Sequence, residues 1–286
     1  MKIRKIVMAF AVVLFAACMY VKPAEAAKTV KPITLKNEKT ISKYDVTGDG
    51  KKDKVKIKCT KPDKYLQGYG TEWKVIVNGK SVLRIAPMWD ECQPEVQLYR
   101  VSKKRVYLSI TERLPNNDDI SGCALFQMKK GKLHKVCDFY DPIVKSITAF
   151  HYYVNISKMT SKSMTVECSD QLYATGRIVW HMNYVYKNGK WKKTGNVYRV
   201  FYDPDNEWID HSSGWTANRK LNVYTTTSLK KKAFTVKKGE VVKIKKLCIK
   251  NGNTYIQLTN KRGKKGWIKN PKKYSDGYFK EVHFAG

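Results

Sequence analysis

The segment Val75–Leu83, "VIVNGKSVL", decides the fold prediction. Two β-branched and apolar stretches flank Asn-Gly at 78–79, the dipeptide that best tolerates the positive φ angles of a two-residue β-hairpin turn. The segments "FQMKKGKLHKV" (126–136) and "YVYKNGKWKKT" (184–194) have the same arrangement, with a Gly-Lys step between two predicted strands. The spacing between the three is not constant, so they indicate a weak repeat of hairpins in successive sheet units.

Alternating or β-branched segments fill the rest of the chain. Examples are "DKVKIKC" (53–59), "RVYLSIT" (105–111) and "VVKIKKLCI" (241–249), each bounded by residues typical of turns. No window sustains a capped helical stripe over three turns. The sequence therefore predicts an all-β protein whose first part is built of propeller-blade-like or hairpin-repeat units.

The first 26 residues have the features of a secretory signal peptide. Lys2, Arg4 and Lys5 precede the apolar run "IVMAFAVVLFAACMY", and Ala24 and Ala26 form the small-x-small pattern of a cleavage site. The run falls short of the ~20 residues that a membrane span needs. Two alternatives stay open, an uncleaved anchor and a lipoprotein lipidated at Cys18. We expect a secreted protein, extracellular or associated with the cell wall, without a stable membrane span.

The chain is strongly basic, with 56 Lys and Arg against 24 Asp and Glu and a formal net charge of +32. The predicted signal peptide carries four of the basic residues and one acidic residue, which leaves a net charge of +29. Such an excess favours polyanionic partners. Secretion argues against nucleic acid and favours an anionic cell-wall polymer or peptidoglycan. The alternative is a solvated, lysine-rich surface without a specific partner.

A change of composition predicts a domain boundary. The segment "FYDPDNEWIDHSSGWTANRK" (201–220) is locally acidic and contains Pro204 and Gly214, whereas the residues after it are very basic. We expect a β-rich domain over 28–205, a linker over 206–215 and a small barrel over 216–275.

The segment "LNVYTTTSLKKKAFTVKKGEVVKIKKLCIKNGNTYIQLTNKRGKKGWIK" (221–269) resembles a bacterial SH3-like domain, most clearly at Gly239 and at Gly-Trp-Ile 266–268. The resemblance implies a non-catalytic module that engages the cell wall or a peptide. Its implied ligand-binding residues are Tyr224, Tyr255 and Trp267, with lysines around them. In the alternative interpretation, Tyr255 and Trp267 fill the core of a small barrel.

The segment "YDVTGDGKKDKV" (44–55) has oxygen donors at the spacing of a calcium loop. Asp45, Thr47, Asp49 and Asp53 occupy positions 1, 3, 5 and 9, Gly50 permits the sharp turn, and Lys51 offers its backbone carbonyl. Lys56 at position 12 and the strand that follows exclude an EF-hand. The pattern resembles the calcium loops of FG-GAP and VCBS propeller-type repeats, which implies weak Ca²⁺ binding. In the alternative, the Asp side chains cap backbone amides in Asx-turns.

The sequence carries no catalytic signature of a serine hydrolase, a zinc protease or a nucleotide-binding enzyme. Six cysteines after residue 26 permit disulfides, and they lack the spacing of a zinc site. Cys92 or Cys123 with His134 or His181 are the candidate nucleophile pairs. Acidic loops occur at 90–95, 118–119 and 203–207. We therefore expect a secreted, non-catalytic cell-surface or cell-wall binding protein that calcium stabilises; the alternative is a hydrolase that the barrel targets to the wall.

Overall fold

The computed structural model describes residues 28–86, 92–114, 120–140, 151–201, 214–271 and 277–282. Within these residues the chain forms nineteen strands and no helix, which confirms the predicted all-β class. The predicted signal peptide and Cys18 lie outside the described residues. No described helix is long and apolar enough to cross a membrane.

The strands are, in chain order, β1 (Ile33–Leu35), β2 (Val55–Pro62), β3 (Gly70–Val77), β4 (Lys80–Ile85), β5 (Gln93–Ser102), β6 (Arg105–Arg113), β7 (Ile120–Lys129), β8 (Lys132–Asp138), β9 (His151–Met159), β10 (Ser163–Leu172), β11 (Gly176–Lys187), β12 (Lys190–Lys193), β13 (Val197–Phe201), β14 (Trp215–Thr216), β15 (Leu221–Tyr224), β16 (Lys232–Val236), β17 (Val241–Lys250), β18 (Asn253–Asn260) and β19 (Lys265–Lys269).

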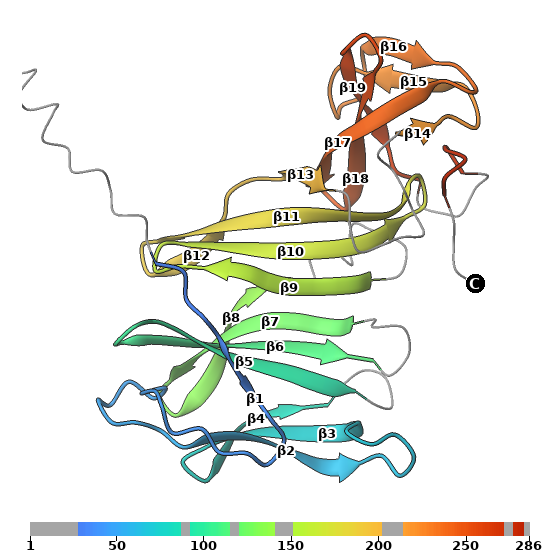
Figure 1. Cartoon of the computed structure of the whole chain (residues 1–286). Coiled ribbons are helices and arrows are strands. Elements are labelled where there is room, and N and C mark those ends of the chain that lie inside the picture. The colour runs from blue at the N-terminus through green and yellow to red at the C-terminus, as the bar shows by residue number, and fades with distance from the viewer. Residues whose placement is uncertain are drawn as a thin grey trace, which may run out of the picture.

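Three antiparallel meanders are stacked on one another (Figure 1). The first is the three-stranded sheet β2-β3-β4. The second is β5-β6-β7-β8, to which β1 adds a fifth strand beside β5. The third, β9-β10-β11-β12, belongs to an eleven-stranded sheet that continues through β13 into the carboxy-terminal strands.

The predicted hairpin turns are present and carry the expected backbone conformation. Asn78, Lys130 and Asn188 have φ angles of 49°, 48° and 55°, and the glycine after each also has a positive φ. Each turn joins the last two strands of its meander: β3–β4, β7–β8 and β11–β12. The weak repeat in the sequence therefore corresponds to the last hairpin of each of the three meanders.

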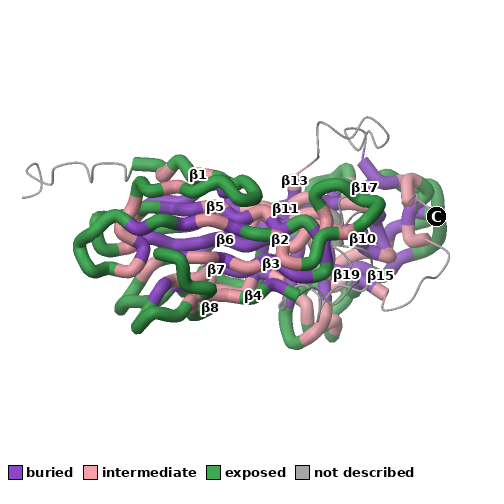
Figure 2. Tube along the Cα trace, turned by 90° about the horizontal axis from the view of Figure 1, so that it is seen from below, coloured by how far each residue is buried: buried purple, intermediate pink, exposed green. Residues whose placement is uncertain are grey.

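The second meander is buried on both faces. In β6, Val106, Leu108 and Ile110 point into the core shared with β2–β4, whereas Tyr107 joins the core shared with the third meander. Because neither face meets water, the segment from Val106 to Thr111 is buried throughout. Figure 2, which looks along the stack, shows β6 coloured as buried between β5 and β7, with exposed chain at the turns.

The carboxy-terminal strands form a small, strongly curved sheet in the order β16-β15-β19-β18-β17. This sheet is joined to the third meander because β13 pairs with β11 at one end and with β17 at the other. The core between the second and third meanders, which we call the upper core, continues into this sheet through Leu247, Ile256 and Leu258. Trp215, which the sequence placed in the linker, is instead a fully buried residue of β14; residues 202–213 lie outside the described chain.

We predict that Gly266→Ala destabilises the carboxy-terminal sheet. A Cβ at this position would lie 2.7 Å from the Tyr224 carbonyl oxygen and 2.7 Å from Val223 Cγ1. The clash falls beside the Tyr224–Trp267 pair that joins β15 to β19. We expect a loss of about 1–3 kcal/mol in unfolding free energy, measured by urea denaturation. Exposed Lys265→Ala, the control, should change it by less than about 0.5 kcal/mol. Equal midpoints for the two variants would contradict the prediction.

Candidate functional site

The face of the eleven-stranded sheet that points away from the cores carries a row of five side chains. Tyr224 lies opposite Trp267, which lies opposite Gln257. The row continues from Gln257 to Lys246 and from Lys246 to Arg199. Directly opposed residues of antiparallel strands lie on the same sheet face. Five strands, β15, β19, β18, β17 and β13, thus place aromatic, amide and cationic groups side by side.

Tyr255 belongs to the same face. It lies two residues before Gln257 on β18 and is paired with Lys269 of β19. The residues that alternate with this set, Ile256 and Ile268, are 0% and 4% exposed and belong to the core. The structure therefore brings together the three residues predicted from the SH3-like resemblance.

The three aromatic residues differ in how much surface they offer. Tyr224 and Tyr255 are half-buried, whereas Trp267 is only 9% exposed. Among the described residues, Trp267 is nevertheless not a member of the core that contains its neighbour Ile268. Trp267 is thus buried, as the alternative interpretation expects, although the sheet register directs it to the face opposite Ile268, and its role in binding stays a prediction. The tyrosines provide most of the accessible aromatic surface.

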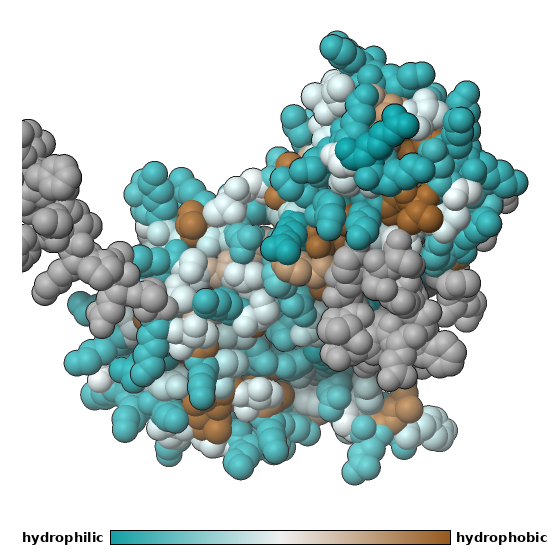
Figure 3. Space-filling model, turned by 45° about the horizontal axis from the view of Figure 1, so that its top comes forward, coloured by the Kyte–Doolittle hydropathy of each residue, from teal (hydrophilic) through white to brown (hydrophobic). Residues whose placement is uncertain are grey.

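Charge surrounds this row. From 214 to 271 the sequence contains sixteen Lys and Arg and one acidic residue, Glu240, whose carboxylate accepts a 2.8 Å hydrogen bond from the Lys237 amide. The surface of these strands is mainly hydrophilic (Figure 3, upper right). The cations predicted to surround the site are all exposed: Lys230, Lys231, Lys232, Lys237, Lys238, Lys243, Lys245, Lys246, Lys250, Lys261, Arg262, Lys264 and Lys265. We call the aromatic row with these cations and Lys269, the exposed partner of Tyr255, the barrel face.

The Asp-Gly loop before β2 is organised around Asp53. This carboxylate is 1% exposed and accepts hydrogen bonds from the Val46 amide (2.6 Å), the Thr47 amide (2.8 Å), the Thr47 hydroxyl (3.1 Å) and Asn78 Nδ2 (2.6 Å). Four donors match the acceptor capacity of a carboxylate. Asp53 therefore ties the loop to the β3–β4 turn through the protein's own donors, and its predicted role as a calcium ligand stays a prediction.

Asp45 and Asp49 have a different arrangement. Asp45 accepts the Gly48 and Gly50 amides at 2.6 and 2.8 Å, and Asp49 accepts the Lys51 amide at 2.8 Å. These are the amide-capping contacts of the Asx-turn alternative. Among the described residues, no three His, Cys, Asp or Glu side chains converge on a metal site. Asp45, Thr47, Asp49 and the Lys51 carbonyl remain as oxygen donors, and Ca²⁺ binding stays a prediction.

We predict that Asp53→Asn destabilises the protein by about 1.5–3 kcal/mol. The new side-chain NH₂ group would face the N–H donors that the carboxylate accepts in the wild type. Burial raises the pKa of the Asp53 carboxyl group, but hydrogen bonds from Thr47, Asn78 and Val46 outweigh it and hold this pKa below 3.8. The carboxylate therefore stabilises the fold above pH 4, and this contribution is lost as the pH falls through the lowered pKa.

Denaturation midpoints measured between pH 2 and 7 check this prediction. Asp49→Asn, which changes an exposed carboxylate with a single amide contact, is the control. Equal midpoints for both variants at neutral pH, or an unchanged acid dependence in Asp53→Asn, would contradict the role given to Asp53.

For the loop as a whole we predict weak Ca²⁺ binding, with a dissociation constant of about 10⁻⁴–10⁻³ M. Isothermal titration calorimetry measures it, with Mg²⁺ as the control ion. The double variant D45N/D49N should bind at least about tenfold more weakly, because two anionic oxygen donors become neutral. A wild-type protein that gives no binding heat at millimolar Ca²⁺ would show that the loop is a set of Asx-turns only.

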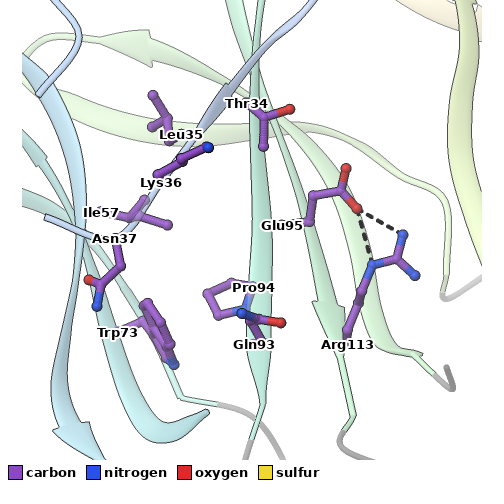
Figure 4. A pocket seen from close by; sticks show the side chains of 10 residues that line it. All are labelled: Thr34, Leu35, Lys36, Asn37, Ile57, Trp73, Gln93, Pro94, Glu95 and Arg113. Atoms are coloured by element: carbon purple, nitrogen blue, oxygen red, sulfur yellow. Dashed lines mark hydrogen bonds and ion pairs between the residues drawn. The ribbon is translucent and has the colours of Figure 1, made fainter. Parts of the chain in front are cut away.

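A cleft of about 320 Å³ opens where β1 leaves the edge of β5 and crosses toward β2 (Figure 4). Leu35, Ile57 and Trp73 line one side. On the other side, Arg113 donates to Glu95 Oε2 from Nε and Nη2 at 3.1 and 2.8 Å. Gln97 Nε2 donates to Glu95 Oε1 at 2.7 Å, so both oxygens of this carboxylate are already bound by the protein.

A second cleft, of about 310 Å³, lies between β4 and the strands β6–β8. It brings Glu112 and Asp138 together with Arg84 and Lys135. Lys135 Nζ lies 2.7 Å from Asp138 Oδ2, and the Arg84 guanidinium is bound to Glu72 at 2.6 Å. Glu112 and Asp138 carry no local sequence signal, because residues separated in the chain meet here only through the sheet register. The acidic loops at 90–91, 118–119 and 203–207 lie outside the described residues.

The candidate Cys–His pairs do not form. All six cysteines after residue 26 are free thiols. Burial raises the pKa of both Cys92 and Cys123 to about 12, so neither is an activated nucleophile. His181 instead lies 2.8 Å from Glu167 on the outer sheet face, and His134 is exposed.

Comparison with protein-family models, with curated proteins and with solved structures finds no match to this chain. The likeness to SH3-like domains and to FG-GAP loops therefore stays a prediction from the residues quoted for it.

Proposed function

We propose that the protein is a secreted, non-catalytic module that binds an anionic polymer of the cell wall through the barrel face. The observation that carries the proposal is the composition of the strands that bear this face: residues 214–271 contain sixteen basic residues and one acidic residue, together with a row of aromatic and amide side chains. Exposed cations attract a polyanion over a distance set by the ionic strength. The tyrosines and Gln257 supply contacts that salt does not screen.

The geometry of the row supports an extended ligand. Neighbouring strands in a sheet are about 4.8 Å apart, so the four steps from Tyr224 to Arg199 span about 19 Å along the curved face. A chain laid across the strands would meet the two aromatic residues first, then Gln257, then Lys246 and Arg199. A polymer with regularly repeated negative charges satisfies such a surface better than a single small anion does.

The alternative, a hydrolase delivered to the wall, has one observation in its favour. The second cleft places Glu112 and Asp138 among its lining residues, and paired carboxylates are the machinery of many glycoside hydrolases. Asp138, however, is held by Lys135 and by the Tyr140 amide at 3.1 Å. Such fixed contacts suit a structural ion pair, and the non-catalytic function is the better supported of the two.

Sedimentation with isolated Gram-positive cell walls tests the proposal. The barrel-face variant K243Q/K246Q/K265Q/K269Q removes four positive charges, and the control variant K31Q/K39Q/K61Q/K64Q removes four from other exposed positions. At physiological salt we expect the barrel-face variant to bind at least about tenfold more weakly than the control, equivalent to about 1.4 kcal/mol. Equal binding of the two variants would contradict the proposal.

Two further arms identify the ligand. The protein should no longer sediment with walls that have been stripped of anionic polymer. Sedimentation with the stripped walls would identify peptidoglycan as the ligand. Tyr255→Ser should weaken binding severalfold even at raised salt, because an aromatic contact is not screened. Release of soluble sugar or peptide from the walls by the wild-type protein, abolished in Glu112→Gln, would support the hydrolase.

A further inference from the structure

The hairpin turns of the three meanders gather at one end of the stack, on the left in Figure 1. They are the turns 78–79, 103–104, 130–131, 160–162 and 188–189, taken with the strand residues on either side, and they join β3–β4, β5–β6, β7–β8, β9–β10 and β11–β12. We call this set the turn end. The third meander meets β13 at Val179 and Trp180. Because Lys187 follows Trp180 by seven residues, the turn end lies roughly 23 Å along β11 from that junction.

Direct contacts hold these turns beside one another. Arg105, which follows the β5–β6 turn, donates from Nη2 to the Ser161 carbonyl oxygen of the β9–β10 turn at 3.0 Å. Its guanidinium also lies 4.2 Å from the centroid of Tyr186, next to the β11–β12 turn. The rings of Tyr107 and Trp191 meet edge to face at 6.0 Å. These contacts join the turns of the second and third meanders into one continuous surface.

The β3–β4 turn is fixed in a similar way. Asn78 donates to Asp53 and accepts the Lys54 amide at 2.9 Å, which binds this turn to the Asp-Gly loop. The stacked sheets are about 10 Å apart. The turns of three sheets thus spread over about 20 Å.

The turn end is uniformly cationic. Its turns contain no Asp or Glu and nine exposed lysines, none of which forms an ion pair within the described residues: Lys80, Lys103, Lys104, Lys129, Lys130, Lys132, Lys162, Lys187 and Lys190. The neighbouring Asp-Gly loop is neutral overall, because its three aspartates are balanced by Lys51, Lys52 and Lys54. Like charges held this close favour a partner that neutralises several of them at once.

We propose that the turn end is a second polyanion-binding surface, so that one molecule bridges two chains of an anionic polymer. The bridging function rests on the proposed function of the barrel face, whereas binding at the turn end does not. The two surfaces differ in chemistry, because the turn end offers lysines without the aromatic row of the barrel face. Binding at the turn end is therefore the more sensitive of the two to salt.

The test uses the full chain without residues 1–26 and long-chain inorganic polyphosphate as the probe. A polymer bridged by a bivalent protein forms networks that scatter light most strongly at an intermediate ratio of protein to polymer. The turn-end variant is K80Q/K103Q/K132Q/K190Q. The barrel-face variant and the control variant defined above each remove the same number of positive charges, four, from other parts of the surface. Circular dichroism and urea midpoints confirm that all variants remain folded.

We expect the wild-type and control proteins to give this scattering maximum, and the turn-end variant to lose at least about four-fifths of it while still binding short labelled polyphosphate at its barrel face. Scattering by the turn-end variant equal to that of the control would overturn the proposal. If the barrel-face variant scatters like the control, the barrel face does not bind the polyanion, and the proposed function is contradicted independently of the turn end. Vesicles with 30% phosphatidylglycerol that bind the wild type but not the turn-end variant, while polyphosphate scattering is equal in all variants, would identify a membrane surface and overturn bridging.

Discussion

The burial of the second meander on both faces is the constraint on which the rest of the structure depends. Leu108 and Val96 complete the core against β2–β4, while Tyr107 and Leu125 complete the core against the third meander. Because both faces exclude water, most side chains there are apolar, and Ser109 and Thr111 are buried polar exceptions in β6. The exposed lysines of the hairpin turns lie at the ends of these strands.

The same upper core couples the stack to the carboxy-terminal strands. Because β13 pairs with β11 and with β17, the outer face of the third meander continues into the barrel face without a break. The position of Tyr224, Tyr255 and Trp267 relative to the stack is therefore set by sheet register rather than by a tether. The turn end and the barrel face consequently hold a fixed relation to each other, as bridging of two polymer chains requires.

The hairpins of this fold could be predicted from short sequence patterns. The features that could not be predicted depend on contacts between residues far apart in the chain. Asn78-Gly79 and Asn188-Gly189 determine their turns through their own backbone preferences, so the hairpins were predictable. The β13–β17 pairing joins residues about 50 positions apart, and no local pattern marks it. Asp53 was assigned to a metal by its spacing, yet its partner Asn78 is 25 residues away and turns the carboxylate inward. Glu112 and Asp138 were missed for the same reason.

The central claim is that a specific face, and not net charge alone, holds this protein at the cell wall. The most direct measurement is the bound fraction of the wild-type and barrel-face variant proteins on isolated walls as salt is raised through the physiological range. The account predicts that both lose binding with salt, and that the wild type keeps a component at physiological salt that the variant lacks. Curves that coincide at every salt concentration, or a wild-type protein that does not sediment at physiological salt, would contradict it.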